Sequence, residues 1–438
     1  MAQSEAVEYA GTIARGRRQW ARGGLLVLIP VLMAGAGIAV LVYLGVHIGV
    51  QALTVGAVAA MIPVPVLVAC FLWLDRYEPE PIKYLAVCLC WGATVAAGLA
   101  LVLNQTAVKV IHLPLAVVAV ATAPLAEESM KALGPLLLFL LRPRAFSGVV
   151  DGIVYCGLSA TGFAMLENIL YLGGYGYAAG ADRGGVAGGV AQVIGIFFVR
   201  IALSGFAHPL FTAMTGIGLG VAARSGSKKV RILAPIAGWL TAMLLHGSWN
   251  LMAELASHTK QYLILLYGYF AVMMPIFLGM VGFALWLRSW EGRLTQRMLP
   301  DYVRAGWLSP PEVAALATMG RRMSARAWAR RVAGDPGLQA MRGFQYAATR
   351  LALLRDGLRR GLHERPDDLA RVREEEQSLL TAISGYRSVY TGRDPQTPEA
   401  HWDGQRYHIR FPDGAVRPFD PPEQPVVPVP VALVPYYR

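Results

Sequence analysis

Charged residues are scarce in this sequence, because only 16% of its 438 positions are Asp, Glu, Lys or Arg, while 55% are hydrophobic. A mean hydropathy of +0.44 excludes an ordinary soluble protein. Cysteine is also scarce, and the four cysteines all lie in apolar runs, so we interpret them as packing residues rather than a disulfide framework or a metal site. A convincing secretory cleavage signal is missing as well. The first apolar run is too long for a signal peptide and predicts a membrane helix.

Long apolar runs are confined to residues 24–287, where stretches of about 20 apolar residues recur, and they stop after Arg288. Only helices or closed barrels satisfy their own backbone in lipid. The fold class is therefore predicted as all-α: a polytopic membrane helical bundle of about eight transmembrane helices, with a C-terminal cytoplasmic helical extension. The stretch 184–199 predicts a separate interfacial or re-entrant helix. The predicted spans are 24–46, 52–74, 84–104, 116–141, 149–172, 200–223, 231–252 and 261–287.

The net charge of +12 reflects basic residues that gather on one side of the predicted bundle. By the positive-inside rule this side is cytoplasmic, so both termini are predicted in the cytoplasm and the protein in the cell membrane, as a multi-pass protein. Because topology explains the charge, we predict the lipid bilayer and no nucleic acid as its partner. These basic residues include Arg18, Arg76, Lys83, Arg142, Arg144, Arg224, Lys228, Lys229 and Arg231.

Changes in composition predict four parts of the chain. Ser309 begins an amphipathic pattern that ends at Gly334, and two further helices are predicted at 338–361 and 366–384. We expect the region 288–438 to bind a cytoplasmic regulatory partner. The parts are a cytoplasmic N-terminal tail at 1–23, a transmembrane domain at 24–287, a cytoplasmic α-helical domain at 288–385, and a short hairpin with a Pro-rich tail at 386–438.

Ionisable residues inside the spans require a reason, because each costs about 2.5 to 3.5 kcal/mol on insertion scales. Glu127 and Lys131 are four residues apart, as are His246 and Asn250, so each pair shares one helix face. One polar face on each of four consecutive spans predicts a shared polar cavity, about five to nine residues below the outer surface. The residues concerned are Glu127, Glu128, Lys131, Glu167, Asn168, Arg200, His208, His246 and Asn250.

The same residues form short motifs whose order resembles that of a known family. They are EExxK at 127–131, FxxxEN at 163–168, a His in AHPLFT at 207–212 and HxxxN at 246–250, preceded by DRYEPEP at 75–81. Together they resemble the PrsW family of intramembrane proteases, within the Abi/CAAX-protease superfamily, over about residues 75–252. Lys131 stands where the CAAX branch commonly has Arg, and Glu167 where it commonly has His. These departures favour the PrsW branch and argue against a prenyl-protein substrate.

The resemblance implies an intramembrane endopeptidase that cleaves a single-pass membrane protein near its outer face, in the manner of site-1 cleavage of an anti-sigma factor. In this interpretation Glu127 is the base that activates water, with Glu128 as the alternative base. His246 and Asn250 would polarise the scissile carbonyl and hold the oxyanion. His208 would position the water or protonate the leaving amine.

Other polar residues have supporting roles in this interpretation. Glu167 and Asn168 would complete the cavity, and Lys131 and Arg200 would neutralise buried carboxylates. The resemblance favours a glutamate-type enzyme without a cofactor, and the sequence has no HExxH motif. Zinc nevertheless remains an alternative, because Glu and His are zinc ligands. The ligands would then be Glu127, His208 and His246.

Three other hypotheses fit parts of the pattern. Buried acids and histidines also mark ion pathways, so a transporter or proton-coupled carrier would use the same cluster, although we see no matching halves of the kind many transporters have. The second hypothesis is a non-catalytic scaffold that functions through its cytoplasmic domain. Such a protein would not need the cluster of acids and histidines. In the third hypothesis the cluster has only a structural role, and Glu127 and Glu128 form a polar contact between helices with Lys131 and Arg200.

The acids of DRYEPEP are expected to stay solvated in a stiff turn.

Overall fold

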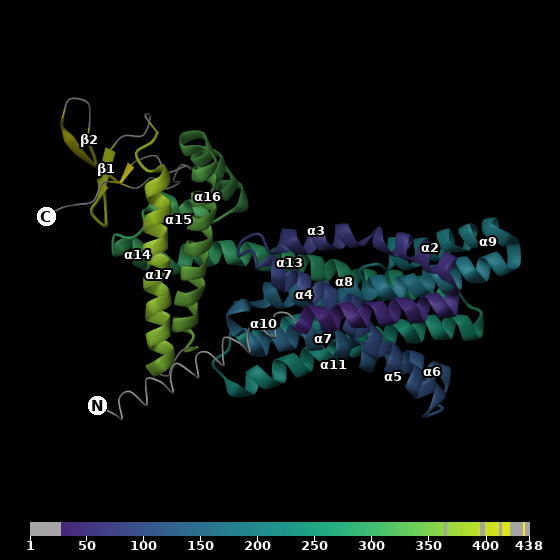
Figure 1. The fold of residues 1–438 in the computed structure, drawn as a ribbon. Coiled ribbons are helices and arrows are strands. Elements are labelled where there is room, and N and C mark those ends of the chain that lie inside the picture. Colours follow the sequence, from purple (N-terminus) through teal and green to yellow (C-terminus); the bar gives the residue numbers. More distant parts are fainter. Residues whose placement is uncertain (1–27, 363–365, 395–398, 411–413, 421–431, 434–438) are drawn as a thin grey trace, which may run out of the picture.

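The structure is a computed structural model that describes residues 28–362, 366–394, 399–410, 414–420 and 432–433. A bundle of long helices running side by side forms its larger part, and helices α16 and α17 stand across one end of this bundle (Figure 1). The all-α polytopic fold class is therefore confirmed. The predicted tail at 1–23 and most of the Pro-rich tail lie outside the described residues.

Six helices in the described part of the chain are long and apolar enough to cross a membrane, whereas about eight spans are predicted. The segment with Glu127, Glu128 and Lys131 is helical but carries three charged residues, so it does not qualify by composition. Val149–Ala223 counts once although it contains more than one predicted span. The six are Leu28–Ile48, Val50–Leu74, Ile82–Lys109, Val149–Ala223, Lys228–Thr259 and Leu263–Arg304.

Short π-helical segments, which have an extra residue per turn, interrupt the bundle helices and often occur at functional sites. Segment η2 precedes α7, η4 follows α8 and η5 precedes α10, and these three α-helices carry most of the predicted site. The bundle comprises Leu28–Ile48, α2 (Val50–Met61), α3 (Val64–Leu74), α4 (Ile82–Trp91), η1 (Gly92–Ala96), α5 (Ala97–Lys109), α6 (Leu115–Val117), η2 (Val118–Thr122), α7 (Ala123–Leu141), the 3-10 turn η3 (Pro143–Ala145), α8 (Val149–Ile169), η4 (Leu170–Ala178), α9 (Ala179–Phe197), η5 (Phe198–Leu203), α10 (Ala207–Ala223), α11 (Lys228–Thr259), α12 (Leu263–Gly268), η6 (Tyr269–Met273) and α13 (Met274–Met298).

Helix α8 is the central helix of the bundle, and nearly every residue from Val150 to Ala164 is buried. Glycines allow its neighbours to approach closely, as expected where helices pack in lipid. A Cβ atom built on Gly152 would lie 2.0 Å from the carbonyl oxygen of Gly216 on α10, so neither position has room for a side chain. The Gly-rich segment 215–223 therefore packs closely against α8.

Helix α9 doubles back within its own length. Gly184 and Gly185 have non-helical dihedral angles, and Gly185 has a φ of 61°, which glycine adopts without steric cost. The part after this break packs on η4, where the side chain of Gln192 donates to the carbonyl oxygen of Tyr175 (2.7 Å). The predicted separate helix at 184–199 is therefore present, at the end of the bundle far from α16 (Figure 1).

The C-terminal helices differ from the prediction in two boundaries. Ser309 caps a helix as predicted, but that helix stops at Leu316, and Thr318 caps a new one. The predicted break between the helix that ends at Gly334 and the one from 338 is present, because Ala333 and Gly334 have non-helical dihedral angles and divide α16 into two helices. The membrane helix α13 runs past the predicted boundary at residue 287. The helices are α14 (Pro300–Arg304), α15 (Pro310–Leu316), α16 (Met319–Arg359) and α17 (Pro366–Tyr390).

A small sheet follows the helices. Strands β1 (Glu399–Trp402), β2 (Tyr407–Arg410) and β3 (Val416–Phe419) pair antiparallel in sequence, which confirms the predicted hairpin. Strand β4 (Ala432–Leu433) pairs parallel with β1, so this part of the Pro-rich tail is ordered against the sheet.

The acids of the loop between α3 and α4 are buried rather than solvated, so that prediction is wrong. Asp75 and Glu78 are 4% and 5% exposed. Glu78 pairs with Arg350 of α16 (3.1 Å), and Arg322 of α16 donates to the carbonyl oxygen of Tyr77 (3.0 Å). The C-terminal helices thus cover the loop and remove it from water. Burial, reinforced by neighbouring carboxylates, raises the pKa of Asp75 to about 8.

Candidate active site

Two adjacent glutamates on α7 face different surroundings. Successive residues of an α-helix point about 100° apart, so Glu127 and Glu128 cannot share one face. Glu127 lines a cavity between the helices, with 7% of its surface exposed. Glu128 is completely buried between α7, α10 and α11 and does not line that cavity. Of the two alternatives for the base, only Glu127 therefore faces the cavity, and the choice between them stays a prediction.

Lys131 joins these two glutamates. Its ammonium lies 2.8 Å from Glu128 and 3.3 Å from Glu127, and it also lies 2.9 Å from Nδ1 of His208. The ring centroid of Phe163 is 4.1 Å away on α8. A completely buried ammonium requires compensating negative charge, and the two carboxylates supply it. The predicted pairing along the helix is present.

The carboxylate of Glu128 contacts three polar side chains. One carboxylate oxygen lies 2.9 Å from Nδ1 of His246 as well as beside Lys131, and the other accepts a hydrogen bond from the hydroxyl of Thr212 (2.7 Å). Nε2 of His246 lies 3.8 Å from the carboxylate of Glu127. Glu128 therefore fixes the orientation of His246 and turns its other nitrogen toward Glu127.

A second cluster of charged residues, centred on Glu167, forms the opposite wall of the cavity. The carboxylate of Glu167 on α8 accepts from Arg200 (2.7 Å) and lies 2.8 Å from Nε2 of His208. Arg200 also donates to the side-chain oxygen of Asn168 (3.1 Å), and its guanidinium stacks 3.6 Å from the ring of Tyr171. Arg200 therefore neutralises Glu167, as predicted, and fixes the position of both polar residues of the FxxxEN motif.

The cavity has a volume of about 520 Å³ and is within the range of small-ligand sites. Asn250 lines it, and its side-chain nitrogen donates to the carbonyl oxygen of Ala119 in η2 (2.8 Å). One of the two N–H groups of Asn250 is thus committed to the backbone, and the oxyanion role stays a prediction. The predicted residues that line the cavity are Glu127, Glu167, Asn168, Arg200, His208, His246 and Asn250, whereas Glu128 and Lys131 lie behind it.

Many residues that line the cavity were not predicted as site residues, and three of them are notable. Asn104 on α5 lines the cavity, and its side-chain oxygen is buried without a hydrogen-bond partner. Trp249 and Glu254 on α11 also line it. An asparagine in an apolar span and a glutamate two turns after His246 were the available signals. Glu127 is twelve residues after the start of α6, and its depth below the outer surface of a bilayer stays a prediction.

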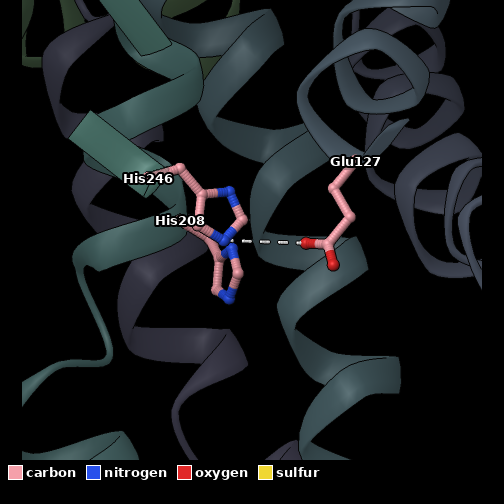
Figure 2. A group of neighbouring side chains, drawn as sticks. All are labelled: Glu127, His208 and His246. Atoms are coloured by element: carbon pink, nitrogen blue, oxygen red, sulfur yellow. Dashed lines mark ion pairs between the residues drawn. The ribbon is translucent and has the colours of Figure 1, made fainter. Parts of the chain in front are cut away.

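Glu127, His208 and His246 come together from three helices (Figure 2). Their donor atoms all lie within 4.8 Å of one another. Zinc ligands lie about 2.0 to 2.2 Å from the metal, so these donors fit a zinc ion after a small adjustment. The contact between Glu128 and Nδ1 of His246 is the kind that orients a metal-binding imidazole. The predicted ligand set is therefore assembled.

A helical membrane bundle that encloses carboxylates and histidines in one cavity fits an intramembrane hydrolase, and the comparisons favour this class over an ion pathway. Residues 80–280 match the model of the PrsW family, described as an intramembrane metalloprotease family. Over these residues the chain is similar to the PrsW family of intramembrane proteases, and three curated proteins of that name support the similarity. No solved structure matches.

Three proteins named Protease PrsW are similar to this chain. The one from Geobacillus kaustophilus is 29% identical over 198 residues, which are 45% of this chain and 79% of that protein. The one from Clostridioides difficile is 28% identical over 210 residues, or 47% of this chain and 82% of that protein. The one from Bacillus subtilis is 32% identical over 139 residues, or 32% of this chain and 55% of that protein.

Proposed function

We propose that this intramembrane protease is an endopeptidase in which Glu127 activates the attacking water. The observation that carries the proposal is the environment of Glu127, whose carboxylate lines the cavity while Glu128 is enclosed by Lys131, His246 and Thr212. A general base must reach both water and substrate, and of the two glutamates only Glu127 does so.

The chemical steps follow from the groups around the cavity. Glu127 takes a proton from water as the water oxygen bonds to the carbonyl carbon of the scissile peptide. His246 stabilises the oxyanion that develops on the carbonyl oxygen. The C–N bond then breaks, and His208 delivers a proton to the leaving amine. Glu167 lies 2.8 Å from Nε2 of His208 and holds this ring in place.

A zinc ion is a second candidate for the same centre, because three suitable donors converge there and the family's description names metalloproteases. The ion would be held by Glu127, His208 and His246, and it would supply Lewis acidity and a water of lowered pKa. Glu167 would then be a carboxylate outside the trio, held by Arg200 and in contact with His208. Metal analysis of the purified protein, with the Glu127→Gln and His246→Ala variants, separates the candidates: stoichiometric zinc that both variants lose supports the metal centre.

We also propose an orientation and a substrate class. The end of the bundle next to α16 carries Arg76, Arg142 and Arg224, and we assign it to the cytoplasm by the positive-inside rule. The catalytic cavity then lies toward the outer half of the bilayer. A single-pass signalling protein of the anti-sigma-factor kind, cut in its membrane segment, is the substrate that this placement and the family resemblance support.

The test maps new protein N-termini in membranes by mass spectrometry. Cells producing the wild-type chain are compared with cells producing Glu127→Gln, and with Glu374→Gln as a matched control on the exposed face of α17. We expect new N-termini inside a single-pass membrane segment with the wild type and the control but not with Glu127→Gln. Equal cleavage by Glu127→Gln would overturn the proposed role.

A further inference from the structure

A second hollow of about 700 Å³ adjoins the catalytic cavity. It lies between the α9–η5 segment on one side and helices α11 and α12 on the other. We call it the lateral groove. Its own lining residues, which do not border the catalytic cavity, are Gln192, Gly195, Ile196, Val199 and Leu265.

The lateral groove and the catalytic cavity form one continuous space. They share lining residues from η4, η5 and α11, so the groove opens into the cavity beside the charged wall of the site. Tyr175, which borders both, is 58% exposed and therefore lies at an open rim rather than in a packed interior. The shared residues are Tyr171, Tyr175, Arg200, Ser204, Trp249, Asn250 and Ala253.

The two walls of the groove are attached to different parts of the bundle. On one side, Gln192 binds the backbone of Tyr175, and α9 is thereby fixed to η4. On the other side, Asn250 binds the backbone of Ala119, which fixes α11 to η2. Both α9 and α11 are fully described, and between them there is no hydrogen bond or ion pair. The groove therefore lies open between α9 and α11, and its two walls are joined where the hydroxyl of Tyr269 in η6 donates to the carbonyl oxygen of Leu203 in η5 (2.9 Å).

The lining suits an unwound membrane segment. Ile196, Val199 and Leu265 provide apolar contacts for side chains. The amides of Gln192 and Asn250 and the ring hydroxyl of Tyr175 provide polar groups at the same surface. A peptide that leaves its helix inside a bilayer exposes backbone groups that lipid cannot satisfy, so a groove with both kinds of lining is what such a segment needs.

We propose that the lateral groove is the entrance through which the membrane segment of a single-pass protein reaches Glu127 from the lipid, bound in an extended conformation. The inference rests on the proposed endopeptidase function, because its occupant is the substrate. It adds the route and the surface that bind this substrate next to the scissile bond.

Two glycines provide a matched test. Gly195 lines the groove, Gly279 lies on α13 outside it, both are exposed, and a Cβ atom at either position has no neighbour within 4 Å. The photo-crosslinking residue p-benzoylphenylalanine therefore replaces either glycine without a clash at its Cβ atom. The probe is a purified single-pass reporter with a Leu/Ala membrane segment and a Gly-Pro step in its outer half, reconstituted with the Glu127→Gln protein in liposomes.

We expect at least tenfold more crosslinked reporter from position 195 than from position 279, with the crosslink mapping to the membrane segment. In the active protein, Gly195→Trp should reduce reporter cleavage at least tenfold, and Gly279→Trp should leave it unchanged. Equal crosslinking at the two positions would overturn the proposal that the lateral groove is the substrate entrance, whether or not the reporter is cleaved. Crosslinking at 195 without any cleavage by the wild-type chain would instead overturn the endopeptidase function and leave the groove as a binding surface.

Discussion

Glu127 and Glu128 are neighbours in the chain, yet only Glu127 lines the cavity, while Glu128 contacts Lys131, His246 and Thr212 and has no exposed surface. The difference separates a residue that acts on substrate from one that positions the residues around it. It also predicts different consequences for substitutions one position apart.

Glu127→Gln should abolish cleavage while changing the unfolding temperature little, because Lys131 keeps its shorter contact with Glu128. Glu128→Ala should reduce cleavage and stability together, since it leaves a buried ammonium without its main partner, a loss of about 3 to 5 kcal/mol. Thermal unfolding in detergent, measured beside activity, distinguishes the two. Similar destabilisation by both substitutions would contradict the assignment.

Arg200→Lys should lower kcat/KM by about tenfold, equivalent to about 1.4 kcal/mol, although the charge is kept. The planar guanidinium of Arg200 contacts Glu167 and Asn168 at the same time and stacks on Tyr171. The ammonium of a lysine has neither this two-point geometry nor a flat face. Arg183→Lys on the exposed part of α9 is the matched control and should behave as the wild type. An unchanged kcat/KM for Arg200→Lys would show that the two-point contact of the guanidinium with Glu167 and Asn168 is not required for cleavage.

The buried loop predicts a pH dependence of stability. The pKa of Asp75 is raised to about 8 from an ordinary value of 3.8, so between about pH 4 and pH 8 the folded state holds a proton that the unfolded state lacks. The free energy of unfolding therefore decreases as pH rises through this window, by at most about 1.4 kcal/mol per pH unit for this group.

The Asp75→Asn variant should show a smaller loss of unfolding temperature between pH 5 and pH 8 than the wild type. Asparagine keeps an oxygen that accepts the hydrogen bond from the Glu80 backbone N–H. Glu80, whose pKa burial raises to about 9, still titrates in the variant, so part of the slope remains. Glu374→Gln is the control, and a slope identical to the wild type in Asp75→Asn would refute the assignment.

Close helix packing predicts opposite effects at two glycines. A Cβ atom on Gly92 would lie 1.8 Å from the carbonyl oxygen of Ser159, so Gly92→Ala forces η1 away from α8. We expect a destabilisation of about 1 to 3 kcal/mol or more. Gly35, in the first helix, has no atom within 4 Å of its Cβ position, and Gly35→Ala should be neutral or stabilising by up to about 1 kcal/mol. Unfolding temperatures test both.

The residues of the candidate site could be predicted from the sequence, whereas the burial of the loop between α3 and α4 could not. Spacing placed Glu127 with Lys131, and charged residues in apolar spans identified the helices that form the cavity. The same reasoning failed for Asp75 and Glu78, because a loop rich in acid and proline has the same composition whether it is solvated or covered. Only the partners on α16, Arg322 and Arg350, which are distant in sequence, decide this.

Helix boundaries and the cavity walls depended on tertiary structure. The π-helical segments beside Glu127 and Glu167 have no signal in hydrophobic spacing, because they shift side chains by a fraction of a turn. Asn104 was passed over because a single amide in an apolar span has several plain explanations. Strand β4 could not be predicted within the Pro-rich tail because it is formed by pairing with β1, about 30 residues earlier in the chain.

The central claim is that Glu127 activates water for peptide hydrolysis within the bilayer. The most direct measurement is cleavage of a purified single-pass substrate in proteoliposomes by the wild-type chain and by Glu127→Gln, with thermal unfolding to confirm that both are folded. The account predicts cleavage inside the membrane segment by the wild type and at least a hundredfold less by Glu127→Gln. Undiminished cleavage by a folded Glu127→Gln protein would contradict it.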